Sequence, residues 1–305
     1  MGKGDVIQMK QIRKSFVFIP LLVTVLLIVI GIAVLTAGQP NEVKIYTGSD
    51  FLRFVERDAD EAEKKAILYA DIELKDPFDV KSLACQFDGN GYSISVKNNN
   101  ICCLFDSVSE TGSVKNLVLA GKLGGTDNQV TAGICMRNLG TLENCIVHAD
   151  FSGGGFVDGI CHTNNGKILN CFVRSEETGE EELRYIWNPI CAENYGSVKN
   201  SYYSDASTGE YETEGTYIPI EEIKDKDIIK TFNDYCENDS GLVGWETDEN
   251  GHPCLKKDDS REAASVFSGS TGVFLVSIII LIVAVPICTI VYVDKQKKEV
   301  FYNKA

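Results

Sequence analysis

A glycine-led pentapeptide recurs four times in the middle of the chain, and this repeat constrains the fold more than any other feature. Each copy has glycine first, an aliphatic residue third and asparagine fifth. The copies are Gly112–Asn116, Gly140–Asn144, Gly166–Asn170 and Gly196–Asn200. They begin 28, 26 and 30 residues apart. A period of this size predicts that the chain stacks several copies of one small structural unit.

The residues around each pentapeptide indicate strands. An Ile-Cys or equivalent pair precedes three copies, at Ile134, Ile160 and Ile190. After the pentapeptide, Cys145 and Val147 alternate with polar or outward positions, which is the period of a strand. One unit is then a short strand, an Asn-x-Gly turn, a second strand and a variable excursion. Such a unit buries its inward side chains only by stacking on the next, so the pattern predicts an all-β domain, a parallel β-solenoid.

The asparagines of successive units are expected to stack in two columns. Asparagine tolerates left-handed backbone angles at a corner and can hydrogen-bond to its counterpart one rung away. The predicted ladders are Asn116, Asn144, Asn170 and Asn200, and Asn138, Asn164 and Asn194. We expect a structural role for both ladders.

These residues resemble the GLUG-type repeat of bacterial surface proteins, whose pattern is close to Gly-Ile followed by Asn-x-Gly-x-Ile-x-Asn-Cys. The resemblance is most specific from Gly112 to Tyr203, and the repeats span about 112–206. It implies a right-handed parallel β-helix with short capping helices. An N-terminal cap would cover 42–80, and a C-terminal cap would cover 218–255.

The resemblance also implies what each cap contains. The N-terminal cap would open with a helix that has Ser49 as its N-cap. The C-terminal cap would hold a short helix over Ile220–Phe232 and a closing hairpin around Trp245. Caps of this kind are expected because the open edges of a solenoid must be covered.

Two long uncharged blocks flank the repeat region. Ser15–Asn41 holds 27 residues and Ala263–Val293 holds 31 residues without a charge. About 20 apolar residues suffice for a helix to cross a bilayer, so we expect transmembrane helices over 15–37 and 273–293. A signal peptide cleaved after Gly38 is the alternative for the first block.

Charge predicts how these segments lie in the membrane. The two ends of the chain carry 8 basic and 3 acidic residues, whereas Glu42–Glu262 carries 21 basic and 41 acidic residues. Basic flanks stay in the cytoplasm. We therefore expect a two-pass protein of the cell membrane, in contact with the lipid bilayer. It would have cytoplasmic tails over 1–14 and 294–305, an extracellular domain over 42–255 and a stalk over 256–272.

Cysteines occupy interior positions of the repeat. Stacked rungs lie about 4.8 Å apart, a separation that disulfides accept. The cysteines at these positions are Cys135, Cys161, Cys191, Cys145 and Cys171. They are either disulfides or stacked thiols that act as small buried hydrophobes. Cys236 and Cys254 form a separate candidate pair.

One outward column suggests recognition. Alternation places Val118, Ile146, Phe172 and Tyr202 on the outside of successive coils, and we refer to these four residues as the stripe. An exposed stripe of this kind would bind a glycan or a surface-protein ligand. The alternative is that it packs beneath the excursions near 151–156 or 183–187.

Enzyme and metal signatures are sparse. Asp150 and Glu176 share a column in adjacent rungs, as a glycosidase pair would require, and they are the weak candidate for a carbohydrate-active enzyme. His148, His162 and His252 form no pair at zinc-ligand spacing, so we expect no metal and no cofactor. The excess of acidic residues disfavours a nucleic-acid partner.

The sequence thus favours a membrane-anchored cell-surface β-solenoid that works as a non-catalytic binding, adhesion or scaffold module. A carbohydrate-active enzyme on the same fold is one alternative. A sensor subunit whose helices pass a signal to another membrane protein is the second.

Overall fold

The computed structural model describes residues 41–97, 100–124, 130–152, 155–175, 185–205, 214–219, 222–223, 227–239 and 241–258. These belong to one compact unit, Asn41–Asp259. The predicted membrane segments, 15–37 and 273–293, and the predicted tails lie outside the described residues. Within the described ranges, no helix is both long and apolar enough to cross a bilayer.

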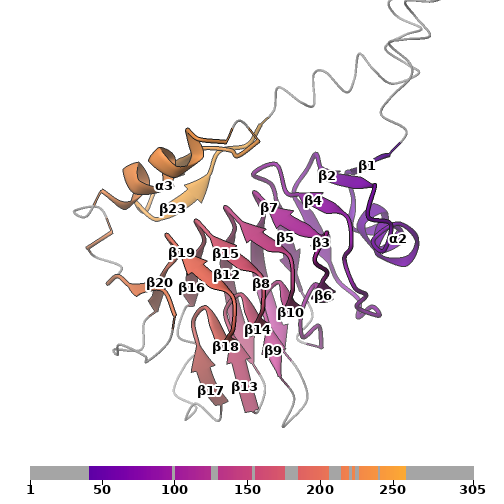
Figure 1. Cartoon of the computed structure of the whole chain (residues 1–305), viewed down its shortest axis with the longest axis horizontal. Coiled ribbons are helices and arrows are strands. Elements are labelled where there is room, and N and C mark those ends of the chain that lie inside the picture. The colour runs from indigo at the N-terminus through magenta and orange to yellow at the C-terminus, as the bar shows by residue number, and fades with distance from the viewer. Residues whose placement is uncertain are drawn as a thin grey trace, which may run out of the picture. The chain divides into compact units, whose positions relative to one another are not determined.

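Two seven-stranded parallel sheets form most of this unit (Figure 1). Sheet A has the order β1 (Glu42–Ile45), β2 (Lys65–Leu68), β4 (Gln86–Asp88), β7 (Ser113–Lys115), β11 (Thr141–Glu143), β15 (Lys167–Leu169) and β19 (Ser197–Lys199). Sheet B has the order β21 (Thr216–Tyr217), β20 (Tyr202–Asp205), β16 (Phe172–Ser175), β12 (Ile146–Ser152), β8 (Val118–Gly124), β5 (Ser93–Val96) and β3 (Ile72–Leu74).

Two smaller parallel sheets complete the coils. Sheet C has the order β18 (Cys191–Asn194), β14 (Cys161–Asn164), β10 (Cys135–Asn138) and β6 (Phe105–Val108). Sheet D has the order β17 (Tyr185–Asn188), β13 (Gly155–Asp158) and β9 (Thr131–Ala132). The chain passes through sheets D, C, A and B in turn, and each strand pairs with its equivalent one coil away. The predicted parallel β-solenoid is confirmed.

The register places the predicted interior residues on top of one another. Leu142 pairs with Val114 on one side and Ile168 on the other. In sheet B, Val147 stands between its equivalents in the coils before and after. Their side chains are fully buried. Each coil therefore fills its interior with aliphatic side chains and excludes water by stacking, as the alternation predicts.

A short helix, α2 (Gly48–Arg57), covers the N-terminal coils. Its N-cap is Thr47, so the prediction of Ser49 is wrong. The reason is a capping box: the Thr47 side chain accepts from the backbone of Asp50, and the Asp50 carboxylate accepts from the Thr47 backbone N–H. Phe51 and Phe54 are buried, and each ring lies within 6 Å of the ring of Phe87 in β4.

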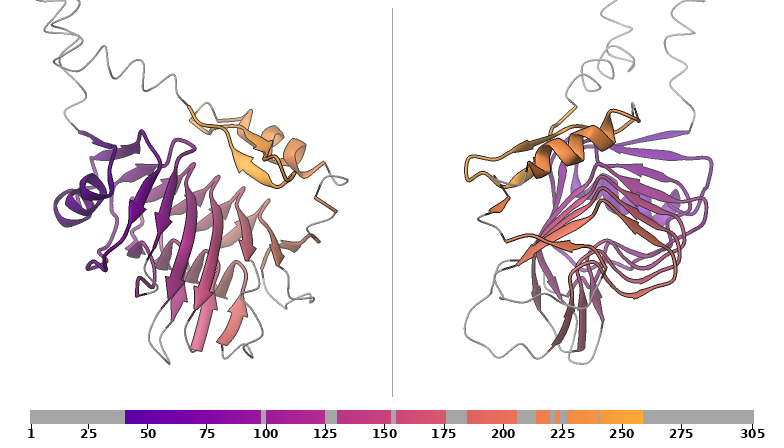
Figure 2. Two further views of the ribbon diagram at one scale, coloured as in Figure 1. Left: turned by 180° about the vertical axis from the view of Figure 1, so that it is seen from behind. Right: turned by 60° about the vertical axis from the view of Figure 1, so that its left-hand side comes forward.

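The C-terminal part of the chain folds back over the coils. Helix α3 (Ile228–Cys236) begins eight residues later than predicted, and β22 (Trp245–Thr247) pairs antiparallel with β23 (Pro253–Leu255). We call residues 227–258 the strap. Figure 2 shows α3 and the hairpin lying along the ridge where the strands of neighbouring sheets meet.

Candidate functional site

The asparagines at the corner between sheets A and B form a continuous hydrogen-bonded ladder. Asn116, Asn144 and Asn170 all have φ of 54°, and Asn200 has 47°, which is the left-handed region. The Asn144 side-chain amide donates to the Oδ1 of Asn116 at 2.8 Å, and that of Asn170 donates to the Oδ1 of Asn144 at 2.7 Å. Asn200 continues the series. We call these four residues the corner ladder.

A second ladder joins sheets C and A with the opposite polarity. The amide of Asn138 donates to Asn164, and that of Asn164 donates to Asn194, both at 2.8 Å. The Oδ1 of Asn138 also accepts from the backbone of Gly140 at 3.1 Å. A side chain at position 140 would meet the backbone oxygen of Gly112 at 2.1 Å, so the Asn-x-Gly turn requires glycine where coils approach closely.

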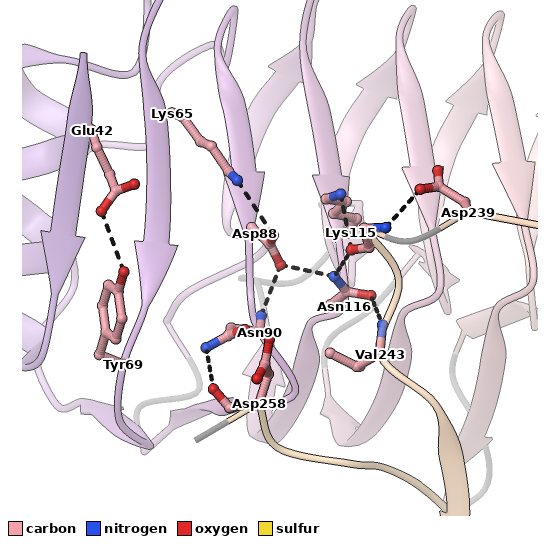
Figure 3. A network of polar contacts seen from close by, with 11 residues as sticks. Glu42, Lys65, Tyr69, Asp88, Asn90, Lys115, Asn116, Asp239, Val243 and Asp258 are labelled. Atoms are coloured by element: carbon pink, nitrogen blue, oxygen red, sulfur yellow. Dashed lines mark hydrogen bonds and ion pairs between the residues drawn. The ribbon is translucent and has the colours of Figure 1, made fainter. Parts of the chain in front are cut away.

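A buried carboxylate ends the corner ladder (Figure 3). Asp88 is fully buried, and its Oδ1 accepts from the side chain of Asn116 at 2.8 Å and from the backbone of Asn90 at 3.0 Å. Lys65 Nζ lies 3.9 Å from its other oxygen. Asp88 was not among the residues expected to form the ladders. The signal was available, because Asp88-Gly-Asn90 occupies the same corner of the coil before Asn116.

The corner ladder also holds the strap, which the sequence analysis did not anticipate. The backbone N–H of Val243 donates to the Oδ1 of Asn116 at 3.1 Å, and its carbonyl accepts from the side chain of Asn144 at 2.9 Å. The indole N–H of Trp245 donates to the Oδ1 of Asn144. The side chain of Asn170 donates to the carbonyl of Phe232. Each buried amide thus binds both its neighbour in the ladder and the strap.

The predicted stripe is in register but is not a free surface. Val118, Ile146, Phe172 and Tyr202 pair in sequence across sheet B, as expected. However, Ile146 is only 4% exposed and Phe172 only 1%, while Val118 and Tyr202 are partly buried. The four residues are thus not exposed as expected, because later segments of the same chain pack against them. Among the described residues, the covering side chains belong to the strap and to Ile218 and Ile223 just before it.

Aromatic rings lie at the centre of the contact between the stripe and Phe232 of the strap. Phe232 of α3 is fully buried, and its ring stacks on Trp245 with centroids 4.0 Å apart. The same ring meets Tyr202 edge-on at 5.4 Å and Phe172 at 6.4 Å. Offset and edge-on aromatic pairs add about 0.5–1.5 kcal/mol each to the burial of their area. The stripe and strap therefore form a second apolar core outside the coils.

The strap ends close to the N-terminal end of the solenoid. The backbone N–H of Asp258 donates to the carbonyl of Asn90 at 3.2 Å, and Lys257 Nζ lies 2.6 Å from a carboxylate oxygen of Asp71. Asn90 follows β4, which is two strands from β1 in sheet A. The chain therefore enters the domain at Glu42 and leaves it at Asp258, two strands away. At about 4.8 Å per strand, these two points are about 10 Å apart along the solenoid axis.

The cysteines of the repeat stack as predicted, and none of the ten described cysteines is in a disulfide. Cys161 pairs in register with Cys135 and Cys191, and all three are buried. Cys145 and Cys171 are fully buried, and each thiol donates to a backbone carbonyl. Cys236 lies against Asn144 and Asn170 in the corner ladder, and Cys254 lies in β23.

A buried acid and a histidine meet where sheet D turns into sheet C. Asp158 is fully buried, and its Oδ2 lies 2.7 Å from His162 Nδ1. Its Oδ1 accepts from the side chain of Asn188 at 2.7 Å. Burial raises the pKa of Asp158 to about 6, although both hydrogen bonds act in the opposite direction. Asp158 can orient the imidazole ring of His162. Burying its carboxylate in the charged form still costs free energy, which the two hydrogen bonds offset only in part.

Replacing Asp158 with asparagine is expected to change how stability depends on pH. The native pKa is raised above the ordinary value of 3.8, so the stabilising contribution of the protonated acid is present at low pH and is lost as pH rises through about 6. Relative to the wild type, the variant should therefore gain up to about 3 kcal/mol between pH 4 and pH 7. Urea unfolding at both pH values measures this gain. Asp150→Asn, in a partly exposed position, is the control, and an equal gain there would contradict the assignment.

Other predicted chemistry is not assembled in the described part of the chain. Asp150 lies in β12 beside Lys122, and Glu176 lies outside the described residues. His252 Nδ1 lies 2.8 Å from an Arg174 nitrogen and 3.3 Å from Asp248. Among the residues that the structure describes, no group of three or more His, Cys, Asp or Glu side chains is placed to hold a metal ion.

Comparison with known proteins adds little to this picture. No family model matches the chain, and no curated protein matches it. One solved structure is similar, that of a proposed immunoglobulin A1 protease from Bacteroides ovatus. It is 10% identical, with a TM-score of 0.31, over 70% of this chain and 91% of that one. A likeness at this level does not assign a function to this chain.

Proposed function

We propose that the chain is a two-pass protein of the cell membrane that carries a right-handed β-solenoid outside the cell as a non-catalytic binding, adhesion or scaffold module. The helices over 15–37 and 273–293 would anchor it in the lipid bilayer. Residues 256–258 of the predicted stalk belong to the strap, so residues 259–272 would link the strap to the second anchor as a stalk. Both termini would lie in the cytoplasm.

The observation that carries this proposal is where the described domain begins and ends. Entry at Glu42 and exit at Asp258 lie about 10 Å apart along the axis, because the strap returns the chain from the last coils to within two strands of β1. This arrangement suits a domain that is tethered to one membrane at both ends. Without the strap, the chain would leave near β19, about 29 Å from β1 along the axis.

Two exposed aromatic side chains on the later coils suit recognition. Tyr195, between β18 and β19, is 71% exposed, and Phe156 in β13 is 41% exposed. Large exposed aromatic side chains offer contact area to apolar faces of sugars or proteins. We propose that a glycan or surface-protein ligand contacts these coils in place of the stripe.

Protease treatment of intact bacterial cells that produce the full chain tests the proposed location. Both termini would carry epitope tags. We expect the protease to digest the region between residues 42 and 258, while both tagged ends are protected until the membrane is permeabilised. The folded coils require prolonged digestion, so cleavage within the stalk is the earliest expected event.

Two outcomes would contradict the proposal. A central domain that is protected in intact cells and digested only after permeabilisation would place the solenoid in the cytoplasm. Recovery of a mature chain that begins near Gln39 would show that the first apolar block is a signal peptide, leaving a single anchor.

The strap favours a sensor subunit as the second candidate function. It contacts Asn144, Phe172 and Tyr202 and continues toward the predicted stalk. A ligand that changed these contacts would change the tension or freedom of the chain leading to the second membrane segment. Ligand-dependent cleavage of the stalk by protease would separate this function from a passive scaffold.

A further inference from the structure

Two adjacent cysteines lie side by side in the connection between β5 and β6. The sulfur atoms of Cys102 and Cys103 are 3.9 Å apart. Successive side chains of a regular strand point to opposite faces, so two neighbouring thiols meet only where the backbone is irregular. Residues 101–103 have no regular secondary structure, which allows the contact.

The two thiols have unequal surroundings. Cys103 is fully buried, whereas Cys102 is partly exposed. The contact between the two sulfur atoms lowers the pKa of Cys102 to about 7, while the same contact and burial raise the pKa of Cys103. Burial raises the pKa of Cys85 to about 12 and also raises that of Cys254. A thiol accessible to reagents therefore stands next to a shielded one.

We propose that Cys102 and Cys103 form a redox-active dithiol that exchanges with small-molecule disulfides. The Cys102 thiolate attacks one sulfur of the disulfide RSSR, which forms a mixed disulfide and releases one thiolate RS⁻. Cys103 then attacks the Cys102 sulfur, closes a Cys102–Cys103 bond and releases the second RS⁻. The protons of the two protein thiols end on the two RSH products, so two protein thiols are oxidised and one RSSR is reduced.

This disulfide would form and break reversibly and would not stabilise the fold. A bond between adjacent residues encloses no loop, so it gives none of the usual loss of unfolded-state entropy. Its Cα atoms would be about 3.8 Å apart across a trans peptide, below the usual range of about 4.4–6.8 Å, so the bond is strained and readily reduced again.

Closing the bond would also act on neighbouring coils. The two sulfur atoms must approach from 3.9 Å to about 2.05 Å, which requires the local backbone to rotate. The carbonyl of Cys102 accepts from Ala132 in β9 at 2.8 Å, and that of Ile101 accepts from Gly124 at the end of β8 at 3.0 Å. Oxidation would therefore strain contacts to the end of β8 in sheet B and to β9 at the edge of sheet D.

Oxidised glutathione provides the test. The full chain, reduced in detergent micelles, would be treated at pH 7 and digested for mass spectrometry. We expect the peptide that contains Cys102 and Cys103 to lose two hydrogens and to keep no glutathione. In Cys103→Ser, glutathione should remain bound to Cys102, because the second step is blocked. The matched control Cys254→Ser, at another partly exposed cysteine, should behave as the wild type.

The rate provides a second criterion that needs no substitution. The lowered pKa of Cys102 leaves more of this thiol ionised at pH 7 than of Cys254, whose pKa burial raises, and the thiolate is the attacking species. In the wild type, Cys102 should therefore react faster than Cys254. A lasting glutathione adduct on wild-type Cys102, or a reaction no faster than that of Cys254, would overturn the proposal.

Discussion

Replacing Asn144 with alanine is expected to lower the free energy of unfolding by about 3–5 kcal/mol. The Asn144 side chain is fully buried and bonds to Asn116, Asn170, Val243 and Trp245. Its loss leaves a carbonyl and an indole N–H buried without this partner, at about 1–2 kcal/mol each. Alanine at φ 54° adds about 1 kcal/mol or more of backbone strain. Urea unfolding of the full chain measures the change.

Two matched variants separate these causes. Glycine adopts the left-handed backbone without strain, so Asn144→Gly should remove the backbone strain but should not restore the lost hydrogen bonds. Asn200 has almost the same backbone angle and bonds to Asn170 and Tyr202, so Asn200→Ala should cost about 1–2 kcal/mol. Equal losses at positions 144 and 200 would show that the strap does not depend on the ladder.

Replacing Trp245 with alanine should release the strap from the stripe. Trp245 is 1% exposed and stacks on Phe232, so truncation removes a large buried side chain at a cost of about 3–5 kcal/mol. Because the strap and stripe form an apolar cluster separate from the interior of the coils, the strap should then unfold before the coils. Limited proteolysis would show cleavage between 227 and 258 while the coils persist.

The control for this prediction is Trp245→Phe. Phenylalanine keeps the ring that stacks on Phe232 but lacks the N–H that donates to Asn144, so we expect a loss of about 1–2 kcal/mol with the strap still bound. If Trp245→Ala left the strap as resistant to protease as in the wild type, the aromatic stack would not be what holds it.

The sequence predicted the coils because their physical cause is local and periodic. Glycine is required where neighbouring turns approach, and asparagine adopts the left-handed corner, so their spacing sets the register. Leu142 and Val147 follow directly, since strand alternation points them inward. The N-cap was wrong because Thr47 and Ser49 are both capable caps, and only Thr47 has Asp50 three residues later.

The strap could not be placed from the sequence. The sequence pattern that places Ile146 and Phe172 on the outside of the coils is the same whether these side chains face water, a ligand or another part of the chain. What covers it comes from α3 and β22, which are 60 to 99 residues further along, and no local pattern encodes that contact. Asp158 and His162 were missed as a pair for a similar reason, since they meet across a corner rather than on one strand.

Hydrogen exchange at the backbone amide of Val243 tests the account most directly, because this N–H donates to Asn116 and holds the strap on the corner ladder. In the full chain, we expect the Val243 amide to be protected about a thousandfold, which corresponds to an opening free energy of about 4 kcal/mol. The amide of Ile146, which donates to Leu117 within the coils, gives the reference. Exchange of Val243 at the rate of an unfolded chain, with Ile146 still protected, would contradict the account, since the chain would then not return from the last coils to within two strands of β1.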